Sequence, residues 1–162
     1  MITTDRLELI RFSEANVEEY IKVMTQPMVS RYLGNGADMT KEVVENLVGQ
    51  FEADWDKGYG VFAVKEKASG QVMGHCGIRP LPDERIELLY AYDPSSWGKG
   101  YATEAGKAML AYGKEHFGLT ELIGISYPEN QGSIGVLKKL GFEYAGVEEY
   151  FGKELEVFRL KV

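Results

Sequence analysis

The spacing of apolar residues in the first third of the chain predicts one strand followed by two helices. Residues 7–11 alternate between apolar and polar side chains, as a half-buried strand does. Four apolar residues then share one helix face, at Val17, Tyr20, Ile21 and Met24. We expect Pro27 to stop this helix, and a second helix to run from an N-cap at Thr40 to Gly58.

The pattern then changes to a period of two, which indicates strands. Residues 61–65 and 71–78 form a predicted hairpin around a turn at residues 68–70. Residues 85–92 form the next strand and carry apolar side chains on both faces, so this strand is expected in the centre of a sheet.

Helices and strands alternate in the last third of the chain. Helices are predicted at about residues 103–117 and 133–140, with Gly141 closing the second in a left-handed conformation. Strands are predicted at residues 122–127, 142–147 and 155–160.

The order of these elements predicts a single α/β (α+β) domain over residues 1–162. We expect a mixed, mostly antiparallel sheet of about six or seven strands flanked by about four helices. The helical crossover between Tyr92 and Leu122 implies that the two strands it joins are parallel.

Composition narrows the class of protein. The net charge of −7 gives no broad electrostatic reason to bind nucleic acid or an anionic membrane. The lone Cys76 excludes an internal disulfide, and His75 and His116 belong to no cluster with the spacing of metal ligands, so no metal is expected. No apolar run approaches the ~20 residues of a membrane span, and the N-terminus lacks a signal-peptide pattern. We therefore expect a cytoplasmic protein.

The loop between the central strand and the next helix is a candidate anion site. Gly98 and Gly100 lie just before the predicted helix, where free N–H groups and the helix dipole favour a diphosphate. A Walker A loop is excluded because the glycine upstream is missing, and a Rossmann fingerprint because Thr103 stands where Gly or Ala is needed. An ordinary strand-to-helix connection remains the alternative.

This loop resembles the acetyl-CoA signature Gln/Arg-x-x-Gly-x-Gly/Ala of the GCN5-related N-acetyltransferases, here Trp97-Gly98-Lys99-Gly100-Tyr101-Ala102. Trp97 replaces Gln or Arg, as in the branch that contains ribosomal-protein N-terminal and spermidine-type acetyltransferases. Residues 130–142 and 4–9 are similar to two further segments of that branch. The resemblance implies transfer of an acetyl group from acetyl-CoA to a primary amine.

The resemblance also implies a cofactor site between two splayed parallel strands, with the pantetheine arm lying there like an extra strand. The backbone N–H of Tyr90 would then stabilise the oxyanion, although Tyr90 and Tyr92 also suit simple strand packing. Lys99 is either a contributor of positive charge or a solvated loop residue. The implied cofactor-binding residues are Tyr90, Tyr92, Trp97, Gly98, Lys99, Gly100, Tyr101, Ala102, Thr103, Asn130 and Ser133.

Catalytic roles follow from the same likeness. Glu87 is the candidate general base, because similar family members often carry Glu there and a carboxylate in an apolar strand is unusual. A salt bridge or an edge-exposed position would also explain this carboxylate, and His75 or water could be the base instead. Ser133 is the candidate general acid, with Tyr127 second, whereas Asn130 and Ser133 also suit a helix cap. Since Cys76 shows no His/Asp partnership of the kind that covalent catalysis needs, direct transfer in a ternary complex is preferred.

The sequence says less about the acceptor amine than about the cofactor. The family selects it with the first two helices, their loop and the final hairpin, here residues 28–39, Trp55 and residues 150–153, whose aromatics and acids suit a cation. Protein N-termini, polyamines, amino acids and other small amines stay open, as do a monomer and a homodimer. The alternatives are a non-catalytic acyl-CoA-binding or sensing domain and an unrelated nucleotide-binding module.

Overall fold

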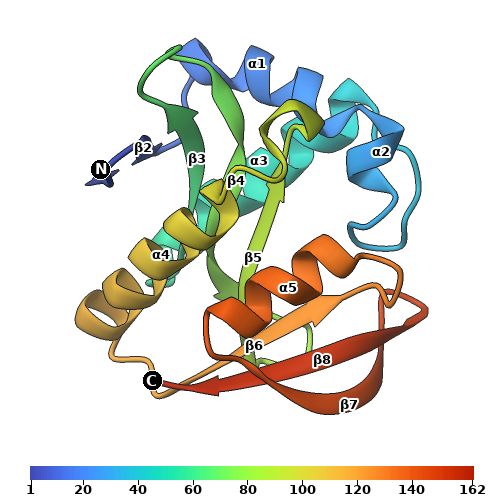
Figure 1. Ribbon diagram of the computed structural model, residues 1–162. Helices are drawn as coiled ribbons and strands as arrows, with labels where there is room; N and C mark the ends of the chain where they lie inside the picture. The colour runs from blue at the N-terminus through green and yellow to red at the C-terminus, as the bar shows by residue number, and fades with distance from the viewer.

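The computed structural model describes residues 1–162 and contains one eight-stranded sheet in the order β1-β2-β3-β4-β5-β6-β8-β7 (Figure 1). All neighbouring strands are antiparallel except β5 and β6, which are parallel as the helical crossover predicted. The strands are β1 (Ile2–Thr3), β2 (Leu7–Ile10), β3 (Gly60–Glu66), β4 (Val72–Pro80), β5 (Ile86–Tyr92), β6 (Glu121–Ser126), β7 (Glu143–Tyr150) and β8 (Lys153–Lys161).

Five α-helices and one 3-10 turn complete the fold: α1 (Glu14–Met24), α2 (Pro27–Ser30), α3 (Lys41–Asp56), α4 (Tyr101–Phe117), α5 (Gln131–Lys139) and η1 (Pro94–Ser96). Thr40 caps α3 as predicted, because its side chain accepts a hydrogen bond from the Val43 N–H. Gly141, with a φ of 96°, follows α5 as expected.

The sheet has one more strand than predicted, and the fold has one more α-helix than predicted. β1 has two residues and α2 has four, which is too short for a periodic pattern to be visible. Pro27 does end the first helix, but it also begins α2, since proline is favoured at the first helical position.

Side chains from the two faces of the sheet enter different hydrophobic clusters. One cluster includes Leu88 and Tyr92 of β5 together with Met109 of α4 and Leu137 of α5. The other includes Ala91 of β5 and residues of α1 and α3. β5 is therefore central and covered on both faces, as its doubly apolar sequence predicted.

The sheet opens between β5 and β6. Their parallel pairing is confined to one register position, Glu87 with Ile123. Beyond it the two strands point in different directions, with α4 in front of the sheet to the left of β5 and α5 beside β6 (Figure 1). This opening is where the functional residues gather.

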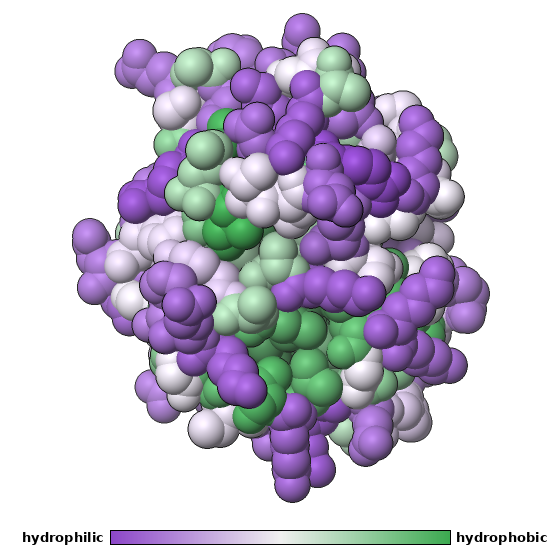
Figure 2. All heavy atoms as spheres, turned by 60° about the vertical axis from the view of Figure 1, so that its left-hand side comes forward, coloured by the Kyte–Doolittle hydropathy of each residue, from purple (hydrophilic) through white to green (hydrophobic).

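The outer surface is mainly hydrophilic on the face drawn in Figure 2, with apolar side chains gathered in the lower part of the view. None of the helices combines the length and the hydropathy needed to cross a lipid bilayer.

Candidate active site

One cavity of about 930 Å³ runs through the opening between β5 and β6 and brings most of the predicted site residues together. Lys99 is the one predicted cofactor-binding residue that does not line it, and it is exposed to solvent. The predicted residues that line the cavity are Glu87, Tyr90, Tyr92, Trp97, Gly98, Gly100, Tyr101, Ala102, Thr103, Asn130 and Ser133.

The glycine loop adopts the backbone that its sequence suggested. Gly98 and Gly100 have φ angles of 76° and 81°, in the left-handed region that other residues adopt with strain. Gly100 is the N-cap of α4, so this helix begins at Tyr101, two residues earlier than predicted. The Trp97 indole N–H donates to the carbonyl of Tyr92 at 2.9 Å and ties the loop to the end of β5.

Six consecutive backbone N–H groups, those of residues 98–103, donate to no other group of the protein. Three of them belong to the first turn of α4, a helix of 17 residues whose dipole adds positive potential. Alternating backbone conformations at such a loop form a concave row of donors. The loop therefore presents an anion site of the kind that holds a diphosphate.

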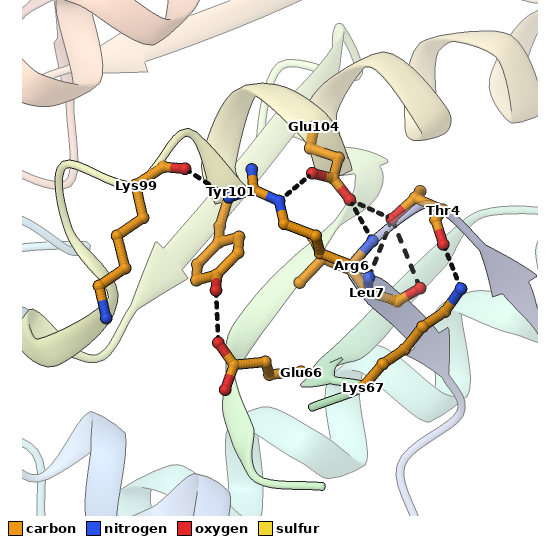
Figure 3. A network of polar contacts seen from close by, with 8 residues as sticks. All are labelled: Thr4, Arg6, Leu7, Glu66, Lys67, Lys99, Tyr101 and Glu104. Atoms are coloured by element: carbon orange, nitrogen blue, oxygen red, sulfur yellow. Dashed lines mark hydrogen bonds and ion pairs between the residues drawn. The ribbon is translucent and has the colours of Figure 1, made fainter. Parts of the chain in front are cut away.

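A polar brace formed by Thr4, Arg6, Tyr101 and Glu104 fixes this loop (Figure 3). The carboxylate of Glu104, in the first turn of α4, accepts from the Thr4 hydroxyl at 2.5 Å and from the Arg6 side chain at 2.7 Å. The Arg6 guanidinium also donates to the Lys99 carbonyl at 2.8 Å. Arg6 thus neutralises a carboxylate that would repel a diphosphate, and it engages the carbonyl that separates the two glycines.

The aromatic ring of Tyr101 completes the brace. Arg6 lies over this ring at 4.3 Å, and the Tyr101 hydroxyl donates to Glu66 of β3 at 2.5 Å. Sequence reasoning gave no role to Thr4, Arg6 or Glu104. The only signal was that residues 4–9 resemble the opening of the family, which said nothing of a contact with the loop.

The hydrogen bonding of β5 orients its backbone toward the opening. The Asp93 N–H donates to the carbonyl of Met73 on β4, and the register continues unbroken along the strand. Because backbone groups in an antiparallel ladder alternate in direction, those of Tyr90 and Tyr92 point away from β4 and toward β6. Since β6 pairs with β5 at a single register position, these groups face the cavity.

The start of α5 brings Ser133 against Tyr90. Their hydroxyl oxygens are 3.1 Å apart, and burial raises the pKa of Tyr90 above its usual value. Asn130 is the N-cap of α5, since its side-chain oxygen accepts from the Ser133 N–H at 3.3 Å. The capping role is therefore present, and it leaves the amide N–H groups of Asn130 without a protein partner. Tyr127 also lines the cavity but donates its hydroxyl to the Gly34 carbonyl at 2.7 Å.

Glu87 lies on the other face of the sheet from Ser133. Alternation along β5 places it with Leu89, which packs against the cluster under α1 and α3, whereas Tyr90 packs under α4 and α5. Burial raises the pKa of Glu87 to about 8, an effect that the nearby Arg79 partly offsets. Arg79 is itself paired with Asp54 at 3.0 Å. Glu87 is thus a carboxyl poised to exchange a proton near neutral pH.

His75 and Cys76 on β4 have buried environments. The His75 ring is hydrogen-bonded to the Tyr20 hydroxyl at 2.7 Å, and burial lowers its pKa to about 3, so the ring is neutral. Burial raises the pKa of the Cys76 thiol to about 12, so it is not a thiolate. No three His, Cys, Asp or Glu side chains are grouped as metal ligands.

The predicted acceptor region only partly reaches the cavity. Met28, Tyr32 and Met39 line it, as does Phe151 in the turn between β7 and β8. Trp55 does not, because its ring packs on Phe62 of β3.

An opened sheet with an anion-binding loop beside it and an ionisable carboxyl within it is the arrangement that an acyltransferase using a coenzyme A thioester requires. Residues 6–143 match the family model described as an acetyltransferase (GNAT) domain, so the chain belongs to the GNAT acetyltransferases. Members of this family are acetyl-CoA-dependent acyltransferases, which confirms the predicted family and enzyme class.

Two curated relatives come from Bacillus subtilis. The uncharacterized protein YkkB is 33% identical over 111 residues, which are 65% of this chain and 64% of YkkB. The uncharacterized N-acetyltransferase YoaA is 25% identical over 150 residues, 91% of this chain and 85% of YoaA.

Solved structures share the fold over nearly the whole chain. A GNAT-family acetyltransferase from Bacillus anthracis has a TM-score of 0.82 and 23% identity, covering 99% of this chain and 97% of its own. The ribosomal L7/L12 N-acetyltransferase RimL, in complex with coenzyme A, has a TM-score of 0.81 and 15% identity, covering 98% of this chain and 96% of its own. Spermidine N-acetyltransferase from Vibrio cholerae, with CoA and spermine, has a TM-score of 0.79 and 17% identity, covering 98% of this chain and 96% of its own.

Proposed function

We propose that residues 1–162 act as one domain that transfers the acetyl group of acetyl-CoA directly to a primary amine in a ternary complex. The observation that supports this is the single cavity through the opened sheet, with the diphosphate loop at one end and Glu87 on the opposite face from Ser133. Two substrates that enter from opposite faces can meet at the opening between β5 and β6.

The donor half of the site is built from backbone groups. The N–H groups of residues 98–103 would hold the diphosphate, and the pantetheine arm would pair with the free edge of β5. The N–H of Tyr90 would then donate to the thioester oxygen as negative charge develops on it.

Glu87 is the proposed general base. An alkylammonium has a pKa near ~10, so the amine must lose a proton before or during attack. The raised pKa of about 8 matches this task, and a cationic amine beside the carboxyl would favour its ionised form. The geometry favours Glu87 over His75, whose ring nitrogen is hydrogen-bonded to Tyr20 in the core.

In the proposed reaction the amine nitrogen attacks the thioester carbonyl carbon, forming a C–N bond as the C–S bond breaks. The proton from nitrogen passes to Glu87. The departing thiolate takes a proton from the Ser133 hydroxyl, which is hydrogen-bonded to Tyr90 and regains a proton from solvent.

The proposal is tested by titrating the protein with CoA and, separately, by following free thiol release from acetyl-CoA with a panel of amines. CoA should bind, ATP and NAD should not displace it, and at least one primary amine should be acetylated. Displacement by ATP would indicate a nucleotide-binding module instead. Tight CoA binding without acetylation of any amine would indicate a sensing domain.

A further inference from the structure

The wall of the cavity on the Glu87 face has an unexpected composition. It is formed by α1, α2, residues 31–40 and α3, and most of its side chains are apolar. They include Met28, Tyr32, Leu33, Met39, Leu47 and Phe51. No Asp or Glu belongs to this part of the wall, and its only charged residue is Arg31.

Sequence reasoning expected acids in this region to attract a cation. The acid in the segment between α2 and α3, Asp38, does not line the cavity. The only carboxylates of the whole lining are Glu87 and Glu129, and Glu129 comes from the loop before α5. Glu87 is therefore the one carboxylate on the proposed acceptor face.

From this wall we infer that the acceptor is a monoamine whose amino group lies beside a substantial apolar group. The inference rests on the proposed function, because it assumes that the amine is acetylated next to Glu87. The amino group meets Glu87, and the apolar group packs against the side chains of α2 and α3. Each methylene removed from water there adds to affinity, as in any apolar pocket.

A polyamine fits this wall poorly. Its second ammonium would lie among apolar side chains with no carboxylate to pair with, and a buried unpaired charge is costly. Arg31 also lines the cavity and repels a second positive charge, whereas the charge of Arg79 is paired with Asp54. The same wall therefore accepts one ammonium and rejects two.

The decisive comparison uses pentylamine and 1,5-diaminopentane, which share a five-carbon chain and differ by one amino group. We expect kcat/KM for pentylamine to exceed that for the diamine by at least about tenfold, and to rise about threefold per methylene from ethylamine to pentylamine. A tripeptide with N-terminal leucine offers the same chemistry from a protein source. The better of the two substrates, pentylamine or the tripeptide, shows whether the acceptor is a small amine or a protein N-terminus.

A matched pair of variants on α3 places a carboxylate inside or outside the cavity. Leu47 lines the cavity, whereas Val43 is 46% exposed and does not. Leu47→Glu should lower kcat/KM for pentylamine and raise that for the diamine by about tenfold, while Val43→Glu should leave both unchanged. Calorimetric titration of the CoA-loaded protein with each amine measures the same preference without turnover.

The outcomes separate the two proposals. Acetylation of the diamine or of spermidine in preference to pentylamine would overturn the apolar monoamine while leaving acetyl transfer intact. No acetylation of any amine would overturn the proposed function, and this inference with it.

Discussion

The two ends of the cavity are built by different means. The proposed donor end consists of six backbone N–H groups that are consecutive in the chain. The proposed acceptor end consists of side chains from α1, α2, residues 31–40 and α3, brought against β5 by folding. A backbone site depends on φ angles and helix dipoles, so outside its two glycines it tolerates changes of side chain, whereas a side-chain site can be rebuilt by single substitutions. The difference suggests a fixed donor and an adaptable acceptor.

The largest effect is expected at Glu87, where the two ends meet. Glu87→Gln should lower kcat/KM for the amine by about 100-fold at pH 8, because a general base contributes on that order or more. In the native protein kcat/KM should rise as Glu87 ionises near its pKa of about 8. The variant should lose this inflection and keep only the ionisation of the amine. An inflection near pH 8 that survives in the variant would assign the base to another group or to water.

The stability of Glu87→Gln tests whether the loss of activity comes from the missing carboxyl or from disruption of the fold. The folded pKa of about 8 lies above the unfolded value near ~4.3, so the protonated carboxyl is the form that suits the fold. Its stabilising contribution is complete below the unfolded pKa and is lost as the pH rises toward 8. Glu87→Gln should therefore be more stable than the native protein by about 2 kcal/mol at pH 8, a value reduced from the full shift because the carboxyl is partly exposed. Urea denaturation should show the difference shrinking toward zero near pH 4.5.

A smaller effect is expected when the brace behind the donor loop is cut. Arg6→Ala removes the contacts with Glu104 and with the Lys99 carbonyl, so the KM for acetyl-CoA should rise about tenfold with kcat changed less than twofold. Arg11 is a matched control at the other end of β2. It pairs with Glu52 at 2.6 Å and lies over the Trp55 ring at 4.3 Å, yet it is far from the loop.

Kinetics with acetyl-CoA varied at saturating amine separate the two arginines. Arg11→Ala should leave the KM unchanged, and Arg6→Lys should restore part of the affinity, because lysine keeps the charge but not the forked contact. Equal losses in the two alanine variants would show that the brace only stabilises the fold.

The smallest effect is expected at Ser133. Ser133→Ala should lower kcat about threefold, since a thiol of pKa near ~8.5 leaves readily and the Tyr90 hydroxyl, 3.1 Å from Ser133 Oγ, stays close. The double variant with Tyr90→Phe should lose more than the product of the single effects if the two hydroxyls substitute for one another. Strictly additive losses, measured by stopped-flow acetylation, would contradict a shared role.

Sequence reasoning predicted the backbone of the proposed donor end because its determinants are local. Gly98 and Gly100 need left-handed backbone, the helix that follows supplies free N–H groups, and these features lie within about ten residues. The alternating and helical patterns likewise predicted the parallel crossover and the central β5. Two elements escaped prediction, β1 and α2, because they are too short to show a period.

Tertiary structure alone decided the brace and the acceptor wall. Arg6 and Glu104 are 98 residues apart, and no local pattern marks a contact between side chains so distant in the chain. Which residues of α1 to α3 face the cavity depends on how those helices pack on the sheet, and this packing kept Asp38 and Trp55 out of the lining. The sequence by itself determined the glycine-containing turn and the helix start that free a row of backbone N–H groups, since φ angles and helix ends are local properties. The character of the acceptor site emerged only when distant side chains were brought together by folding.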